Sequence, residues 1–134
     1  MFSIVIPSLG LKRQINKRYL YKKRYNLIDC LTSLKNHYDF NVIQVNVIFN
    51  SCKRSEIEYV LDKFPNINYS INKQNIGVPR SWNQGVHLSR GEYLCFANDD
   101  VEINKGALEK MVKRLTVSNA PRIIIRTRTA NLSV

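Results

Sequence analysis

The chain has 134 residues, 44% of them hydrophobic, which is enough for one domain with a real core. Its 21 Lys and Arg against 10 Asp and Glu give a net charge of +11, which favours anionic partners such as nucleic acid, phosphate esters or lipid headgroups. Its three cysteines form no C-x-x-C pair, and no signal peptide or long apolar run is present, so we expect a cytoplasmic protein without disulfides or zinc.

The first elements alternate between strand and helix patterns. Residues 2–6 form a β-branched run that Pro7 is expected to halt, because proline cannot donate to a strand ladder. Residues 25–37 carry apolar side chains at helical spacing, and residues 42–49 are rich in Val and Ile, as in a second strand. Another helical pattern follows and is closed by Pro65.

The same alternation continues to the end of the chain. A third strand is predicted over 67–71, a third helix over 78–89 and a fourth strand over 92–97. A helix capped by Asn104 and a last strand over 122–127 complete the pattern. Such alternation predicts βαβ units, and therefore an α/β domain with a mostly parallel sheet sandwiched by helices.

Polar residues gather where the predicted strands end, and ligands of such sheets bind beyond the carboxyl ends of the strands. Asp99 and Asp100 follow the fourth strand, and a carboxylate pair there can hold a hard divalent cation while leaving positions for phosphate oxygens. The plain alternative is that both acids only favour the positive end of the next helix, worth about 0.3–1 kcal/mol. The strand ends are Pro7-Ser8, residues 46–51, residues 72–77 and residues 98–100.

The stretch from residue 72 to 103 resembles the family 2 glycosyltransferases, which have the GT-A fold. Its N-x-G…N-x-G segment, then R-G-E-Y, an apolar strand and N-D-D-V-E in place of a D-x-D motif, follow the order and spacing of that family. The opening FSIVIPS and the segment CLTSL at 30–34 resemble the family's first strand and first helix. The resemblance implies a single Rossmann-like GT-A domain over residues 1–134, incomplete at its C-terminus and without the acceptor-binding part.

The resemblance also implies a nucleotide-diphosphate sugar as donor, bound with Mg²⁺ or Mn²⁺. Carried over to this chain, Asn98 would face the ribose and Asp100 would hold the metal, with Asp99 as the second choice. Asn in place of the first Asp keeps a hydrogen-bonding side chain, which a ribose contact tolerates. The donor site would be completed by Pro7, Ser8, Asn75, Gly77, Arg80 and Asn83.

Two positions depart from the family pattern. Trp82 holds the place where the family often has Arg, and we expect it in the core or pocket wall rather than as a sugar-stacking platform. The acid that usually ends the second strand and reads the base is also missing. Aligning FNVIQVN places Asn46 there, whereas aligning on the following Ser places Phe49 or Asn50 there. We prefer Asn46, and the identity of the base stays open because Asn offers both a donor and an acceptor.

Residues 9–24 look like a basic insertion beside the nucleotide site. Seven Lys and Arg lie between Lys12 and Arg24 without an acid, and tyrosines interleave with them. This composition suits a nucleic-acid strand, an anionic membrane surface or a nucleotide diphosphate, and the plain alternative is a solvated loop.

No general base for sugar transfer is evident in the chain. Glu102 and Glu109 follow the acidic motif too closely, and the tail RIIIRTRTANLSV contains no acid. Two hypotheses follow. The first is the donor-binding part of an inverting glycosyltransferase that transfers a sugar to the hydroxyl of an undetermined glycan, lipid or protein. The second is a catalytically inactive GT-A-like module that binds nucleic acid or anionic membrane through its basic face.

Overall fold

The described strands lie in one parallel sheet with the order β3-β2-β1-β4-β5. The computed structural model describes residues 1–11, 26–118 and 123–126, so most of the basic insertion lies outside the described residues. The strands are β1 (Phe2–Ser8), β2 (Gln44–Asn50), β3 (Asn68–Asn72), β4 (Tyr93–Ala97) and β5 (Ile123–Arg126). The helices are α1 (Leu27–His37), α2 (Arg54–Lys63), α3 (Val78–Leu88) and α4 (Ala107–Ser118). The predicted α/β fold is confirmed.

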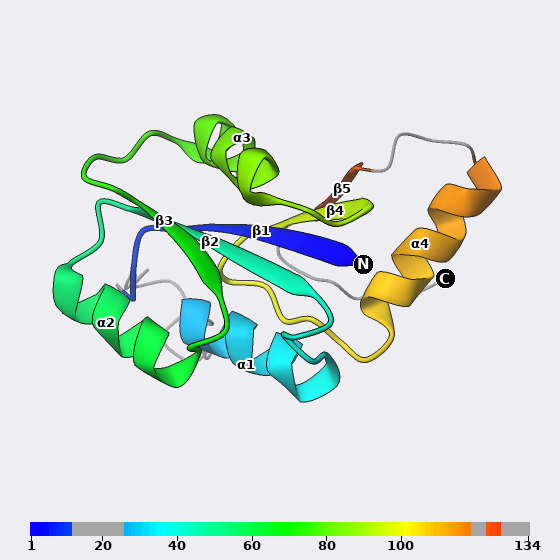
Figure 1. Ribbon diagram of the computed structural model, residues 1–134, viewed down its shortest axis with the longest axis horizontal. Coiled ribbons are helices and arrows are strands. Elements are labelled where there is room, and N and C mark those ends of the chain that lie inside the picture. Colours follow the sequence, from blue (N-terminus) through cyan, green and yellow to red (C-terminus); the bar gives the residue numbers. More distant parts are fainter. Residues whose placement is uncertain (12–25, 119–122, 127–134) are drawn as a thin grey trace, which may run out of the picture.

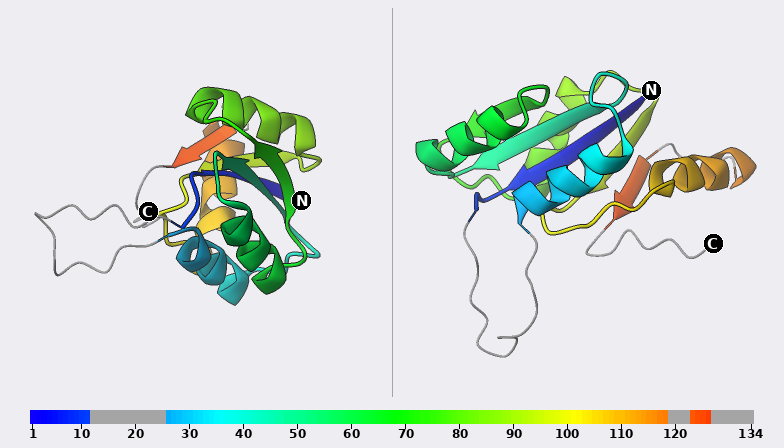
Figure 2. Two further views of the ribbon diagram at one scale, coloured as in Figure 1. Left: turned by 90° about the vertical axis from the view of Figure 1, so that its left-hand side faces the viewer. Right: turned by 90° about the horizontal axis from the view of Figure 1, so that it is seen from below.

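Helices cover both faces of the sheet (Figures 1 and 2), with α3 on one face and α1 and α2 on the other. Side chains along a strand alternate between faces, so Ile4 and Ile6 enter the large core cluster with α1 and α2. Val5 enters a second, smaller cluster together with Ile48 and Phe96, beneath α3. Within the described residues, no helix is both long and apolar enough to cross a bilayer.

Each predicted element is present, and most predicted boundaries lie within two residues of the observed ones. The end of β1 and the start of α4 differ from the prediction for identifiable reasons. Pro7 does not halt β1, because pairing with β2 continues to Ser8. Pairing with β4 stops at Val5, so Pro7 lies where one of the two ladders has already ended, a position that tolerates proline. Helix α4 begins at Ala107 after Gly106, whose φ is 78°, rather than directly after Asn104.

Local backbone features fix the starts of α1 and α3. Asn26 caps α1, since its Oδ1 accepts from the backbone N–H groups of Ile28 (2.9 Å) and Asp29 (3.3 Å). The Asp29 carboxylate accepts in return from the Asn26 N–H, which completes a capping box. Helix α3 begins after Gly77, whose φ of 81° favours glycine.

Candidate functional site

The predicted acidic pair lies where the strand order reverses. The chain runs outward from β1 through β2 to β3 and then crosses to β4 on the other side of β1. The carboxyl ends of β1 and β4 are therefore neighbours, and the Ser8 Oγ donates a hydrogen bond to the Asp99 Oδ2 at 2.8 Å. In open parallel sheets this switch point is where ligands bind. The structure thus brings Ser8, Asn98, Asp99 and Asp100 to one place.

Burial shapes the electrostatics of this place. Burial raises the pKa of Asp99, the neighbouring Asp100 raises it further, and the hydrogen bond from Ser8 opposes the shift. Beneath the acids, the Cys30 Sγ lies 3.9 Å from the Asn98 carbonyl oxygen. Burial, and then Asp99, raise the pKa of this thiol, so it stays neutral. Negative charge is costly here, and a bound cation would stabilise the ionised carboxylates.

The donor atoms at the switch point fit a Mg²⁺ or Mn²⁺ ion shared with a ligand. Asp99 and Asp100 supply hard carboxylate oxygens, which these ions prefer. Within the described ranges, no group of three or more His, Cys, Asp or Glu side chains could hold a metal ion. Mg²⁺ commonly binds through one or two carboxylates together with substrate phosphates. The side chains therefore suit a cation that arrives with a diphosphate.

The start of α3 lies at the same edge of the sheet, because α3 follows the carboxyl end of β3 (Figure 1). The Asn75 Oδ1 accepts from the Gly77 N–H at 3.0 Å, which shapes the turn into the helix. Arg80 in the first turn and Asn83 in the next are exposed. A helix N-terminus favours anions, and an exposed Arg adds a full positive charge. The arrangement can bind a phosphate group.

Asn46 lies away from these residues. It is fully buried in the middle of β2, paired with Val5 of β1, and its Nδ2 donates to the Ser89 Oγ at 3.0 Å, past the end of α3. Strand β2 continues to Asn50, so Asn50 occupies the carboxyl end instead. The structure does not bring Asn46 together with the other predicted site residues, because the preferred alignment placed the carboxyl end of the strand four residues too early.

A cluster of amide side chains behind this edge was not predicted. The Asn50 Nδ2 donates to the Ser81 Oγ at 2.6 Å, and the Asn72 Nδ2 donates to the Asn50 Oδ1 at 2.9 Å. Asn72 and Gln84 exchange two hydrogen bonds of 2.8 and 2.9 Å. The cluster ties the ends of β2 and β3 to α3. A polar residue that ends a buried strand is the one sequence signal that could have indicated it.

Two α3 residues act in packing. A Cβ on Gly85 would lie 2.0 Å from the Val5 Cγ1, so this glycine lets α3 pack closely on β1. The Trp82 ring lies 5.3 Å from the Phe96 ring in the smaller core cluster, as the core interpretation of Trp82 expects. Its Nε1 is buried without a hydrogen-bond partner among the described residues.

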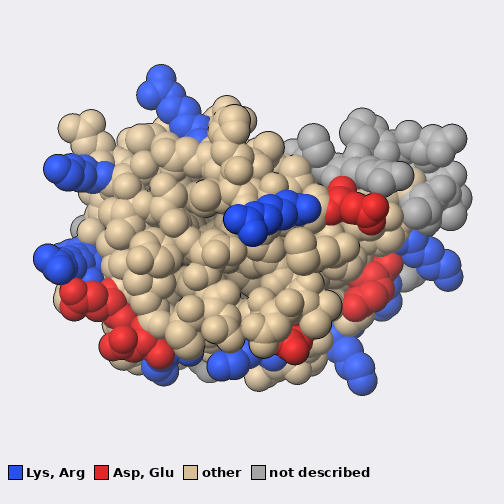
Figure 3. Space-filling model, in the orientation of Figure 1, with Lys and Arg blue, Asp and Glu red and all other residues tan. Residues whose placement is uncertain are grey.

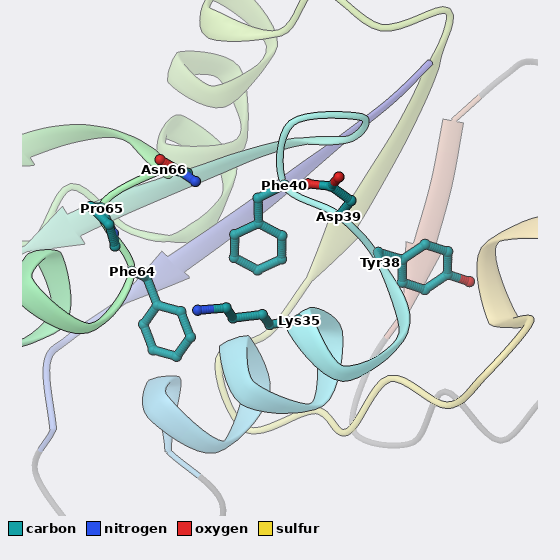
Figure 4. A pocket seen from close by; sticks show the side chains of 7 residues that line it. All are labelled: Lys35, Tyr38, Asp39, Phe40, Phe64, Pro65 and Asn66. Atoms are coloured by element: carbon teal, nitrogen blue, oxygen red, sulfur yellow. The ribbon is translucent and has the colours of Figure 1, made fainter.

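A separate hollow of about 190 Å³ lies at the opposite, amino-terminal edge of the sheet (Figure 4). Two of its lining residues are in contact, because the Lys35 Nζ lies over the Phe64 ring, 5.7 Å from the ring centroid. None of the predicted site residues lines this hollow, so it is distinct from the switch point. Its lining residues are Lys35, Tyr38, Asp39, Phe40, Phe64, Pro65 and Asn66.

Comparison with known proteins identifies the family. Residues 20–130 match the family described as Glycosyl transferase family 2. The chain belongs to this family. The match covers the switch-point acids and the start of α3, which are therefore part of the family's domain. Among curated protein sequences, none matches the chain.

Solved structures of glycosyltransferases share the fold, which is GT-A. The crystal structure of TarS residues 1–349 from S. aureus has a TM-score of 0.64 at 20% identity, covering 88% of this chain and 33% of TarS 1–349. The TarS 1–349 complex with UDP-GlcNAc has a TM-score of 0.62 at 19% identity, with coverages of 88% and 32%. The mannosyltransferase PcManGT from Pyrobaculum calidifontis, in complex with GDP-Man and Mn²⁺, has a TM-score of 0.61 at 14% identity, with coverages of 85% and 32%. The chain spans about a third of the length of these proteins.

Proposed function

We propose that the chain is the donor-binding part of an inverting family 2 glycosyltransferase that uses a nucleotide-diphosphate sugar with Mg²⁺ or Mn²⁺. The observation that carries the proposal is the hydrogen bond from Ser8 to Asp99, which seats the acidic pair at the switch point of the sheet. Support comes from the family match and from GT-A structures described as complexes with UDP-GlcNAc, or with GDP-Man and Mn²⁺.

The proposed roles follow from position. Asp100 is the first metal ligand, Asp99 is oriented beside it by Ser8, and Asn98 contacts the ribose. Arg80 and the N–H groups at the start of α3 bind the diphosphate, since both attract anions. The cation, when bound, neutralises charge on the departing diphosphate. Base recognition belongs to the end of β2, where Asn50 lies.

We place the general base and the acceptor site outside the residues described here. Glu109 is engaged elsewhere, because its carboxylate accepts a hydrogen bond of 2.6 Å from the Tyr38 hydroxyl. Glu102 is exposed and follows the acidic pair directly. A base must reach the proton of the acceptor hydroxyl, and neither side chain is supported in that role by a contact. Whether the acceptor is a glycan, a lipid or a protein must therefore be determined with the whole protein.

Thermal unfolding with nucleoside diphosphates tests the proposal. A ligand that binds only the folded state at 100 times its Kd stabilises that state by about 2.7 kcal/mol. We expect UDP, GDP or a related diphosphate to raise the Tm only when Mn²⁺ or Mg²⁺ is present. The double variant Asp99→Ala/Asp100→Ala should lose this shift, whereas the matched variant Glu102→Ala, two residues further on, should keep it. An equal shift in the double variant would contradict the metal assignment.

Binding of nucleic acid or anionic membrane by the basic insertion stays the second candidate. It is favoured by the local excess of Lys and Arg between residues 12 and 24, which lie outside the described residues. A salt-sensitive shift of DNA or RNA, or of anionic vesicles, would support it. The cytoplasmic location also stays a prediction.

A further inference from the structure

Strand β3 forms an outer edge of the sheet. Among the described strands it pairs with β2 on one side and with none on the other. In Figure 1, β3 crosses in front of β2, so this edge faces the reader. Two large side chains on it are exposed, Tyr69 by 46% and Ile71 by 53%. An open strand edge offers a row of unpaired backbone groups to another strand.

The backbone directions along β3 show which groups face outward. The Ser51 N–H donates to the Asn72 carbonyl at 3.0 Å, so Asn72 points toward β2. In a parallel ladder the N–H and C=O of one residue point the same way, and successive residues alternate. Ser70 therefore also points toward β2, whereas Tyr69 and Ile71 direct their backbone groups away from the sheet. Two donors and two acceptors thus face outward in one line.

We propose that β3 pairs antiparallel with β3 of a second copy, about a two-fold axis through Ser70. In this register Tyr69 lies opposite Ile71 of the second copy, and the symmetry repeats the pair. The outward N–H and C=O groups of Tyr69 and Ile71 then form four hydrogen bonds between the copies. Ser70 meets Ser70 of the second copy as a non-hydrogen-bonded pair, with Cα atoms about 4.5 Å apart.

The sequence of β3 is complementary to itself in an antiparallel arrangement. Asn68-Tyr69-Ser70-Ile71-Asn72 has Asn at both ends and Ser at its centre, so reversing it again places Asn opposite Asn. An aromatic residue opposite a β-branched residue is a favourable cross-strand pair. A symmetric dimer requires such self-complementarity, because residue i must contact residue j on both copies.

Charge also favours a second copy, although the chain as a whole carries a net charge of +11. Residues 64–72 contain no charged side chain, and Lys73, just past the strand, would lie opposite Ile67 rather than another cation. Figure 3, in the orientation of Figure 1, shows most Lys and Arg at the periphery of this face. Pairing here therefore brings no like charges directly opposite each other.

The proposed contact leaves the donor site free. It extends the sheet beyond β3, whereas the switch point lies between β1 and β4. A contact made by one short strand falls in the size class of weak, transient interfaces. The dimer should therefore depend on protein concentration.

A cysteine at the symmetry axis tests the register. Under mild oxidation Ser70→Cys should form a disulfide between copies, because Cα atoms about 4.5 Å apart lie within the range for this bond. The matched control is Asn68→Cys on the same face of the same strand, whose counterpart in the second copy would be about 13 Å away by the rise of a strand. We expect at least five times more covalent dimer from Ser70→Cys than from this control or the wild type. Equal yields would overturn the proposal.

Sedimentation of the unmodified chain provides a second measurement. The average mass should rise toward twice the monomer mass with concentration, and Ile71→Pro should abolish the rise. This variant removes an outward N–H that β2 does not use, and edge strands tolerate proline there. A dimer with a Kd as weak as about 1 mM would still be detected at that concentration. If the wild type stays monomeric at all concentrations up to about 1 mM, the proposal is overturned.

Discussion

Replacing Gly85 by Ala is expected to destabilise the protein, although alanine is the better helix former. The new Cβ would lie 2.0, 2.6 and 2.9 Å from the Cγ1, Cγ2 and Cβ atoms of Val5, whereas ordinary van der Waals contact begins near 3.4 Å. Val5 is fully buried in the central strand and cannot turn away. Helix propensity favours Ala by about 0.5–1 kcal/mol, whereas overpacking a core costs about 1–3 kcal/mol.

A 2.0 Å approach places the overpacking in the upper part of its range, about 2–3 kcal/mol, so the net loss should be about 1–2.5 kcal/mol. Such a loss lowers the Tm of a chain of this size by about 4–9 °C. Thermal and urea unfolding followed by circular dichroism measure it. The neighbouring variant Val86→Ala, at an exposed position of the same helix, should change stability by less than about 0.5 kcal/mol. A Gly85→Ala protein as stable as the wild type would refute the close packing of α3 on β1.

A double variant isolates the contact. Val5→Ala removes the Cγ1 and Cγ2 atoms that the new Cβ would meet, although the Val5 Cβ remains at 2.9 Å. The loss in Val5→Ala/Gly85→Ala should therefore be smaller than the sum of the two single losses, with a coupling of about 0.5–3 kcal/mol. Additive losses would show that the two residues do not meet.

Two further predictions concern the site and the helix that begins beside it. Burial raises the pKa of Asp99, so folding favours its protonated carboxyl. The stability that this preference contributes is fully present below pH 3.8, the ordinary pKa of an Asp, and is lost as the pH rises through the higher pKa of the folded state. Metal-free Asp99→Asn should therefore be more stable than the wild type at pH 7, and urea unfolding should show the gain vanishing below pH 3.8; a gain that persists there would contradict the assigned cause. Asn26→Ala removes the acceptor for two N–H groups at the start of α1 and should cost about 1 kcal/mol in thermal unfolding, whereas an unchanged Tm would argue against the cap.

The fold could be predicted because apolar residues repeat with the period of each element. Ile4, Val5 and Ile6 read as a strand buried on both faces, and Leu27, Leu31 and Leu34 lie on one helical face; both features are present in the structure. Parallel pairing then placed the strand ends at one edge, which located the acidic pair correctly relative to β1.

The residue at the carboxyl end of β2 was misassigned by the family alignment. The apolar run predicted a strand over 42–49, one residue short of the observed end at Asn50, but aligning FNVIQVN with the family pattern chose Asn46, four residues before that end. Both residues are amides in an apolar run, so residue type did not distinguish them. The amide cluster was missed because it depends on tertiary packing. Asn72 meets Gln84 only because α3 packs back over the sheet, and this packing depends on the contact of Gly85 with Val5.

The position of the metal is the central claim, and paramagnetic broadening by Mn²⁺ in the presence of UDP or GDP tests it most directly. In an amide NMR spectrum of the folded chain, the signals of Ser8, Asp99 and Asp100 should disappear first as Mn²⁺ is added with the diphosphate. The signals of Phe40 and Phe64, at the opposite edge of the sheet, should remain. Early loss of the Phe40 and Phe64 signals, with Ser8 and Asp100 unchanged, would contradict the account.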